Sequence, residues 1–269
     1  MKTILTTTAF ALMASTALAD TITLYTSQPN ADAQQTVDAF KAANPDTDVE
    51  WVRDGTTKLM ARLRAEIEAG NPQPDVLLIA DTVTLEGMAQ DGLLTAYQSP
   101  EAANYDSALY SADGFYHSTK LITTGIVYNT GVETAPTSWN DLSDAALKGQ
   151  VAMPSPLYSG AALIHLATLT GDDSLGWGYY EQLAENDARA QGGNGGTFKA
   201  VASGEKPYGM VVDFLAIRNK AEGSPVEFVF PTEGVSYVTE PVAIMSTAKN
   251  VEGAQKFVDF LLSAEGQDV

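Results

Sequence analysis

The sequence DVLLIA at residues 75–80 indicates the fold class, because it is a short and almost continuous apolar run. Runs of this kind are typical of strands in parallel sheets, which are covered on both faces. Upstream, the turn sequence Gly70-Asn71-Pro72 follows segment 59–67, whose apolar residues recur at helical spacing. The order of helix, turn and buried strand predicts an α/β protein with parallel sheets.

The same alternation of strand and helix extends outward toward both ends of the chain. Strands are expected at 21–25, 49–52, 125–128, 150–153, 208–212 and 226–230. Helices are expected at 33–43, 159–170, 175–186 and 251–262. The glycine cluster 192–196 is expected to form a tight loop, where the backbone approaches a ligand or another part of the protein.

Residues 1–19 have the pattern of a secretory signal peptide. Lys2 precedes a short apolar stretch, and Ala17-Leu18-Ala19 is a cleavage sequence before Asp20. We therefore expect a cleaved leader and a periplasmic mature protein. No other stretch approaches the roughly 20 apolar residues of a membrane span, and the chain has no cysteine for a lipid anchor. The sequence leaves open whether the C-terminus, shortly after the helix expected at 251–262, is complete.

The composition argues against several classes of function. The formal net charge of −19 disfavours binding to nucleic acid or to anionic membranes. The chain has only two histidines, His117 and His165, which argues against zinc chemistry, and both are expected to be structural. An anionic ligand would have to be held by local donors against the field of the whole protein.

Short motifs recur along most of the chain, and their order is more specific than any one of them. They are Leu24-Tyr25 and segments 70–76, 92–94, 126–129, 136–142, 231–235, 240–244 and 257–267. In this set and order the chain resembles the periplasmic solute-binding proteins of ABC importers. Within that family it is similar to the branch that contains ferric-ion binders and the 2-aminoethylphosphonate and organophosphate binders.

The resemblance implies an α/β fold of two lobes, like the type II periplasmic binding proteins, with a central ligand cleft and a hinge. Lobe 1 would comprise residues 20–126 and 240–269, and lobe 2 residues 127–239. The implied function is that of a monomeric receptor, not an enzyme, with no cofactor. It would deliver a small anionic or zwitterionic solute to an ABC permease of the inner membrane.

Ferric-ion binders of this branch hold the metal with a histidine, a glutamate and two adjacent tyrosines. In this chain the matching positions carry Pro29, Ala80, Asp213 and Phe214. No set of hard oxygen donors for ferric iron remains at these positions, so no metal site is expected.

The residues that hold an anion in these relatives are retained. Ser159-Gly160-Ala161 matches a Ser-Gly-Ala at a helix start, where backbone N–H groups point outward and attract negative charge. Asn194 matches another phosphate-contacting residue. The family geometry directs further loop residues toward the cleft: Ser27, Thr57, Asp81, Thr82 and Ser155.

Asp213 is expected at the carboxyl end of the strand at 208–212, where α/β clefts place ligand contacts. A carboxylate there would attract a cation on the ligand. A phosphonate or phosphate ester that also carries an ammonium group satisfies both ends of such a site. The favoured ligand is therefore 2-aminoethylphosphonate, with Asp213 pairing the ammonium.

Other possibilities stay open at the level of sequence. Ferric iron and polyamines are alternative ligands for the same fold. An exported hydrolase, a different class, would use a cleft carboxylate or Ser246 of the S-x-x-K pattern at 246–249, which has no K-T-G companion. The sequence also leaves open whether Glu233 assists Asp213, and whether Tyr158 or Tyr237 contacts the ligand.

Overall fold

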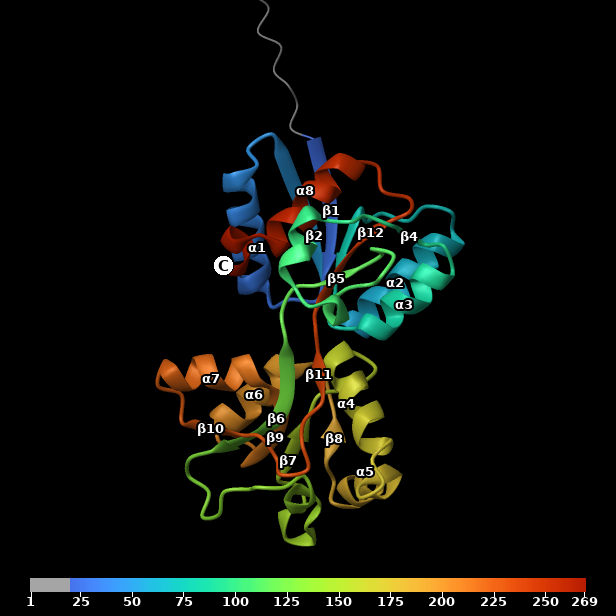
Figure 1. Cartoon of the computed structure of the whole chain (residues 1–269). Helices are drawn as coiled ribbons and strands as arrows, with labels where there is room; N and C mark the ends of the chain where they lie inside the picture. The colour runs from blue at the N-terminus through green and yellow to red at the C-terminus, as the bar shows by residue number, and fades with distance from the viewer. Residues whose placement is uncertain (1–19) are drawn as a thin grey trace, which may run out of the picture.

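Two separate sheets organise the chain in a computed structural model that describes residues 20–269 (Figure 1). The expected signal peptide, residues 1–19, lies outside the described residues. Each sheet is the centre of one lobe, and helices cover its faces. The expected fold class, a two-lobed α/β protein, is therefore confirmed.

The first lobe contains a sheet with the strand order β2-β1-β3-β12-β4, and β5 also pairs with β12. Its strands are β1 (Asp20–Thr26), β2 (Thr47–Arg53), β3 (Val76–Leu78), β4 (Leu94–Thr95), β5 (His117–Ser118) and β12 (Pro241–Met245). Its helices are α1 (Asn30–Ala43), α2 (Thr56–Glu68), α3 (Thr82–Gln90), α8 (Val251–Leu262) and α9 (Ala264–Gln267).

The second lobe contains a sheet with the order β10-β6-β9-β7-β8, and β11 also pairs with β6. Its strands are β6 (Ile122–Asn129), β7 (Val151–Met153), β8 (Arg189–Ala190), β9 (Tyr208–Val212), β10 (Val226–Val229) and β11 (Tyr237–Val238). Its helices are α4 (Gly160–Thr170), α5 (Gly176–Glu185), α6 (Asn194–Ala202) and α7 (Asp213–Ala221).

Residues 75–80 behave as the apolar run predicts. In β3, Val76 and Leu78 face one core cluster with Phe40 and Phe257, whereas Leu77 faces a second cluster with Leu59 on the other side of the sheet. The strand is thus covered on both faces. This double burial explains why the run has no polar alternation.

The expectation of parallel sheets is only partly correct, because both sheets are mixed. Strand β1 pairs in parallel with β2 and β3, and β7 pairs in parallel with β8 and β9. By contrast, β12 runs antiparallel to β3, and β6 runs antiparallel to β9 and β10. The antiparallel pairs include the strands next to the lobe crossings, β6 and β12, whose directions are set by the passage of the chain between the lobes.

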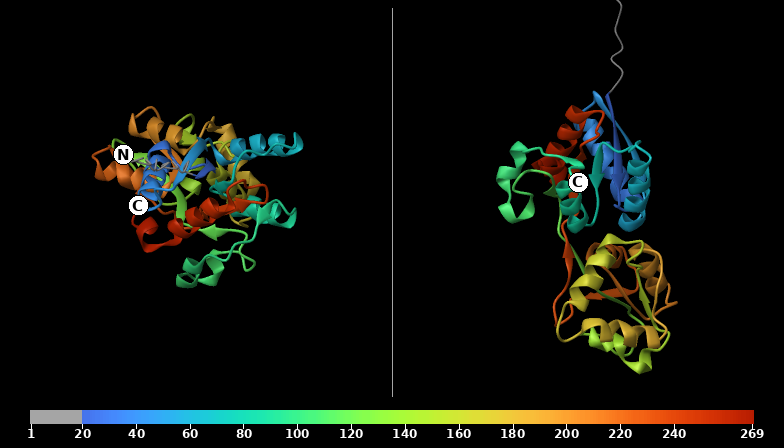
Figure 2. Two further views of the ribbon diagram at one scale, coloured as in Figure 1. Left: turned by 90° about the horizontal axis from the view of Figure 1, so that it is seen from above. Right: turned by 90° about the vertical axis from the view of Figure 1, so that its right-hand side faces the viewer.

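Two crossing segments join the lobes and lie side by side along one edge (Figure 2). The outgoing segment enters β6 at Ile122, and the returning segment passes from β11 to β12. The backbone N–H groups of Thr119 and Lys120 both donate to the carbonyl of Thr239. The expected lobe boundary at residue 126 falls inside β6, which belongs wholly to the second sheet, whereas the boundary at 239/240 falls between β11 and β12.

No helix within residues 20–269 has the length and apolar character needed to cross a membrane.

Candidate ligand-binding site

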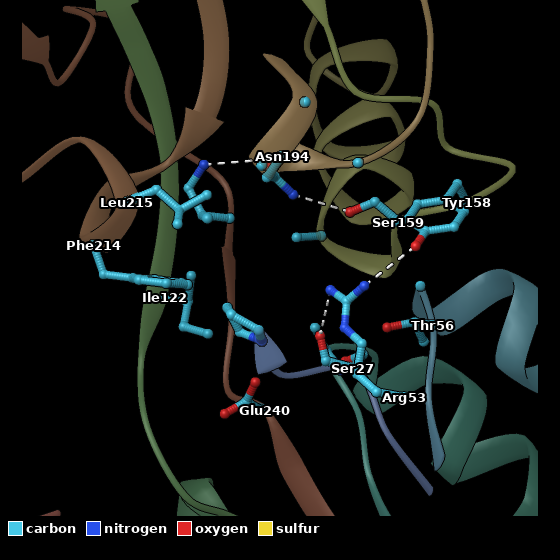
Figure 3. Close-up of a pocket in the computed structure, with 18 residues that line it drawn as sticks. Ser27, Arg53, Thr56, Ile122, Tyr158, Ser159, Asn194, Phe214, Leu215 and Glu240 are labelled. Atoms are coloured by element: carbon cyan, nitrogen blue, oxygen red, sulfur yellow. Dashed lines mark hydrogen bonds between the residues drawn. The ribbon is translucent and has the colours of Figure 1, made fainter. Parts of the chain in front are cut away.

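A cavity of about 240 Å³ lies between the two lobes. Its volume is below the roughly 300–1,000 Å³ of ordinary drug-sized ligand pockets, so it suits a small solute. Figure 3 shows the side chains that line it, which come from both lobes and from the returning crossing segment. They are Ser27, Pro29, Arg53, Gly55, Thr56, Ala80, Ile122, Tyr158, Ser159, Ala161, Gly193, Asn194, Gly195, Gly196, Val212, Phe214, Leu215 and Glu240.

Arg53 supplies the positive charge of this cavity. It is the last residue of β2, at the carboxyl end of a parallel strand. Its Nε donates to the carbonyl of Gln28 at 2.7 Å, and its Nη1 donates to the hydroxyl of Tyr158 in the other lobe at 3.3 Å. These contacts hold the guanidinium group beside the cavity. Among the lining residues, only Arg53 and Glu240 carry a formal charge.

Four helices begin at the wall of the cavity. First-turn residues of α2 (Thr56), α4 (Ala161), α6 (Asn194) and α7 (Phe214) all line it. The first N–H groups of a helix lack intrahelical partners and carry partial positive charge. No side chain caps α2, α6 or α7. The four helix starts and Arg53 therefore bring positive charge to the cavity, where Glu240 is the one carboxylate among the lining residues.

Ser159 and Asn194 connect two of these helix starts (Figure 3). The hydroxyl of Ser159 accepts from the backbone of Ala162 at 3.3 Å and from the Asn194 side-chain amide at 3.1 Å. The carbonyl oxygen of Asn194 accepts from the backbone of Val212 at 3.2 Å. The chain of hydrogen bonds fixes α4 and α6 relative to strand β9.

The two lobes contact each other beside the cavity, so this is a closed conformation. Thr57 of lobe 1 donates its backbone N–H to the carbonyl of Tyr158 at 3.2 Å and its hydroxyl to the carbonyl of Pro156 at 3.0 Å. A Cβ atom on Gly160 would lie 2.5 Å from the backbone oxygen of Ala80 in the opposite lobe. The close approach requires glycine at this position.

Four of the ten residues expected to bind a ligand line the cavity. They are Ser27, Ser159, Ala161 and Asn194. The hydroxyl of Ser27 accepts the backbone N–H of Ala80 at 3.0 Å, which ties the β1–α1 loop to the end of β3.

The other six expected site residues do not line the cavity. Gly160 and Thr57 lie at the interlobe contact just described. Asp81 caps α3 by accepting from the backbone of Thr84 at 3.0 Å. Thr82 shares a hydrogen bond with Thr239, and the hydroxyl of Ser155 accepts from the backbone of Leu157.

Asp213, the sixth, is not among the residues that line the cavity. One carboxylate oxygen accepts from the backbone N–H and the hydroxyl of Thr123, at 3.1 and 2.6 Å. The other accepts from the backbone of Phe214 at 2.7 Å. The residue directly follows β9, as expected, and begins α7; its carboxylate is satisfied by Thr123 of β6 and by the backbone of Phe214. The expected pairing with a ligand ammonium therefore has no support in this geometry.

Glu240 is the carboxylate that does line the cavity, and the sequence analysis gave it no such role. It is 3% exposed. Its Oε2 accepts from the Gln28 amide at 3.2 Å and pairs with Lys120 at 3.1 Å. Burial raises the pKa of the Glu240 carboxyl group, although Lys120 and Gln28 act in the opposite direction.

Sequence reasoning also missed Arg53, and Tyr158 was left open. A signal for Arg53 existed, because a charged residue at the carboxyl end of a predicted parallel strand is a candidate ligand contact. Nothing local distinguishes Glu240, since its place in the cavity depends on the path of the returning chain.

Glu233 and Tyr237, whose roles the sequence left undecided, do not line the cavity. Glu233 accepts hydrogen bonds from the backbone of Trp139 at 3.2 Å and from the Ser138 hydroxyl, so it anchors a loop of the second lobe. Tyr237 is 60% exposed on β11 and does not line the cavity.

Two alternatives that the sequence left open, a receptor for ferric iron and an exported hydrolase, can be compared with the same geometry. Residues 20–269 contain no group of three or more His, Cys, Asp or Glu residues arranged to hold a metal. Ser246, the first residue of the S-x-x-K pattern, follows the end of β12 and is absent from the cavity lining.

The two lobes, the paired crossing segments and the interlobe cavity define the class of periplasmic solute-binding proteins. The model of the family described as bacterial extracellular solute-binding protein matches residues 25–268. The chain belongs to this family. Its members are transport receptors and not enzymes, and the family implies a periplasmic receptor that passes a small solute to an ABC permease.

Individual relatives carry different ligand names. The "Iron uptake protein A1" of Synechocystis sp. is 28% identical over 81% of this chain and 65% of its own length. A "Putative 2-aminoethylphosphonate-binding periplasmic protein" of Salmonella typhimurium is 28% identical over 86% of this chain and 68% of its own length. The solved structure of AfuA from Actinobacillus pleuropneumoniae, with exogenous fructose-6-phosphate bound, has a TM-score of 0.83 at 28% identity, covering 92% of this chain and 81% of that one.

Proposed function

We propose that this receptor binds a small phosphonate or phosphate ester, with 2-aminoethylphosphonate as the favoured ligand. The observation that carries the proposal is the convergence of Arg53 and four helix starts on one cavity. Guanidinium groups and helix N-termini are the usual partners of phosphate oxygens in proteins. The monomeric state and the absence of nucleic-acid partners remain predictions from the sequence.

The alternatives fit this cavity less well. Ferric iron needs several hard, anionic oxygen donors, whereas Glu240 is the single carboxylate among the lining residues and Arg53 lies with it. A polyamine carries no negative group for Arg53 or the helix starts to bind, and would be repelled by the guanidinium.

The opposite wall of the cavity favours a short tail over a sugar. Ile122, Phe214 and Leu215 form an apolar surface across from Arg53 (Figure 3). Each sugar hydroxyl buried there without a hydrogen-bond partner would cost binding energy. Two of the three relatives named above, one for 2-aminoethylphosphonate and one with fructose-6-phosphate bound, concern phosphorus-containing ligands, and the third is an iron uptake protein.

Calorimetric titration tests the proposal directly. The protein should bind 2-aminoethylphosphonate more tightly than fructose-6-phosphate, and should bind neither ferric citrate nor putrescine. Native mass spectrometry of the purified protein should show bound cargo of phosphonate or phosphate-ester mass. Tight binding of ferric iron or putrescine, with no binding of any phosphorus-containing anion, would show that the proposal is wrong.

A further inference from the structure

Glu240 occupies an unusual position in the backbone. It lies between β11 and β12, on the returning segment that joins the lobes, and has φ +42°. Left-handed backbone is rare for residues other than glycine, and strain of this kind persists only where the surrounding structure holds it in place. The carbonyl of Glu240 accepts the Thr119 hydroxyl at 2.7 Å, which ties it to the outgoing segment. The backbone therefore presents this carboxylate to the cavity from the hinge.

One oxygen of the Glu240 carboxylate, Oε2, has protein partners, whereas the other, Oε1, has none among residues 20–269. Lys120 and the Gln28 amide both approach Oε2. No hydrogen bond from residues 20–269 reaches Oε1, although the side chain lines the cavity. Oε1 is not among the fully buried atoms that lack a partner, so it keeps contact with open space, where a donor on a ligand can replace water.

The nearby charges leave this carboxylate short of compensation. Lys120 is partly exposed and approaches from the crossing segment, whereas Asp32 of α1, although paired with Arg218, adds negative charge. Desolvation outweighs the stabilising effect of Lys120 and Gln28, so the pKa of Glu240 is raised. A second cation on the cavity side would relieve this imbalance.

We propose that Glu240 is the residue that selects for a cationic tail, by accepting a hydrogen bond at Oε1 from a ligand ammonium group. The inference rests on the proposed organophosphorus ligand and specifies its class: a zwitterion with its anionic end at Arg53 and its ammonium at the hinge. It assigns to Glu240 the role that the sequence suggested for Asp213, whose carboxylate oxygens are both occupied by Thr123 and Phe214.

The test compares two probes that differ only in the ammonium, 2-aminoethylphosphonate and ethylphosphonate. Titrations of the wild type should show a preference for 2-aminoethylphosphonate of about tenfold to hundredfold, the range expected for a hydrogen bond to a charged group. Glu240→Gln keeps the shape of the side chain and should reduce that preference to about one. Asp213→Asn, the matched control, should leave the preference unchanged even if it weakens both probes equally.

Lys120→Gln provides a variant with the opposite expected result. It removes the cation that competes for Glu240, so the preference for 2-aminoethylphosphonate should increase. If Glu240→Gln fails to fold, the preference can still be measured in Lys120→Gln, because the Lys120 side chain is partly exposed. Since the readout is a ratio of two affinities, a general structural defect does not move it.

The possible failures are distinguishable. A wild type that binds both phosphonates equally would overturn the role of Glu240 while the proposed function stands. An unchanged preference in both Glu240→Gln and Lys120→Gln would do the same, as would its loss in Asp213→Asn alone. A wild type that binds neither probe would overturn the proposed function and this inference with it.

Discussion

Arg53 places a single positive charge at the cavity of an acidic protein. The formal net charge of −19 repels an anion at long range. At contact distance the local donors dominate, because the guanidinium and the helix starts lie within hydrogen-bonding reach of the cavity, whereas distant charges are screened within about 8 Å at physiological salt. The donors at the cavity, and not the net charge of the protein, therefore set which sign of ligand charge the cavity favours.

Replacing Arg53 with Gln should weaken binding of 2-aminoethylphosphonate by about 10- to 100-fold, because the variant loses a charge-assisted hydrogen bond. Calorimetric titration measures this effect. Arg64→Gln is the matched control, since Arg64 is exposed on α2 and does not line the cavity. Equal affinities in the two variants would remove Arg53 from the site.

His165 should make folding stability sensitive to acid. It is 4% exposed, its Nδ1 lies 3.0 Å from the Ser236 hydroxyl, and its ring packs 4.6 Å from that of Trp139. Burial lowers its pKa to about 3. Between about pH 6.5 and 3 the unfolded chain therefore binds a proton that the folded protein excludes, so stability falls as the pH falls, by up to about 1.4 kcal/mol per pH unit.

Urea unfolding at pH 7, 5.5 and 4 checks this prediction, with His165→Gln as the comparison. Carboxyl groups with lowered pKa, such as Glu66, also destabilise the fold in acid, so the informative quantity is the difference between the two proteins. The wild type should lose more stability than the variant over this interval. Parallel losses would contradict a buried, neutral histidine.

Among the helices and strands, those that depend on a local sequence pattern were predicted correctly. The continuous apolar run became β3, and the amphipathic segment 251–262 became α8 with the bounds expected. Asn250 caps that helix by accepting from the backbone of Gly253 at 2.9 Å. Both elements carry their signal within a few residues, because burial pattern and capping are local properties.

Elements that depend on distant parts of the chain were missed. The glycine cluster was expected to be a loop, yet Asn194, Gly195 and Gly196 form the first turn of α6. Glycine disfavours helix, so tertiary contacts stabilise this turn: Asn194 hydrogen-bonds to Ser159 and Val212, and α6 packs against β9. The antiparallel directions of β6 and β12, and the contact of Asp213 with Thr123, likewise follow from how the chain crosses between the lobes.

The start of α4 makes an interlobe contact and also lines the cavity. Gly160→Ala should lower affinity for 2-aminoethylphosphonate by about tenfold, because the added Cβ would lie 2.5 Å from the Ala80 oxygen only when the lobes meet. Stability without ligand should change by less than about 0.5 kcal/mol, since Ala suits a helix. Calorimetric titration and urea unfolding measure the two effects.

Gly178→Ala in α5 is the matched control for this variant. A Cβ at Gly178 meets no atom within 4 Å. The substitution should leave affinity unchanged and stabilise the protein by roughly 0.5–1 kcal/mol. An unchanged affinity in Gly160→Ala would mean that binding does not require this interlobe contact.

At the scale of the whole molecule, the site exists only when both lobes are present. Arg53 and Thr56 come from lobe 1, Ser159, Asn194 and the start of α7 from lobe 2, and Glu240 from the segment between them. No single stretch of sequence contains enough of these residues to indicate the cavity. The family resemblance indicated the helix start at Ser159-Gly160-Ala161, of which Ser159 and Ala161 line the cavity, whereas Arg53 and Glu240 were recognised only from the fold.

An ion pair between the lobes lies beside the crossing residues Thr119 and Lys120 and should matter much less than the contact at Gly160. The guanidinium of Arg218 in α7 donates to both carboxylate oxygens of Asp32 in α1, each at 3.2 Å. The Arg218 side chain is 59% exposed, and exposed ion pairs contribute about 0.2–1 kcal/mol.

Asp32→Asn should therefore weaken binding of 2-aminoethylphosphonate by no more than about fivefold, because the pair stabilises only the closed state and water screens it. The difference from wild type should disappear near 1 M salt, where the screening length falls to about 3 Å. Calorimetric titration at low and high salt measures both effects, and small-angle scattering with ligand should still detect the compact closed form. A loss approaching that of Gly160→Ala, or one that persists in high salt, would mean that this ion pair and not the contact at Gly160 holds the lobes together.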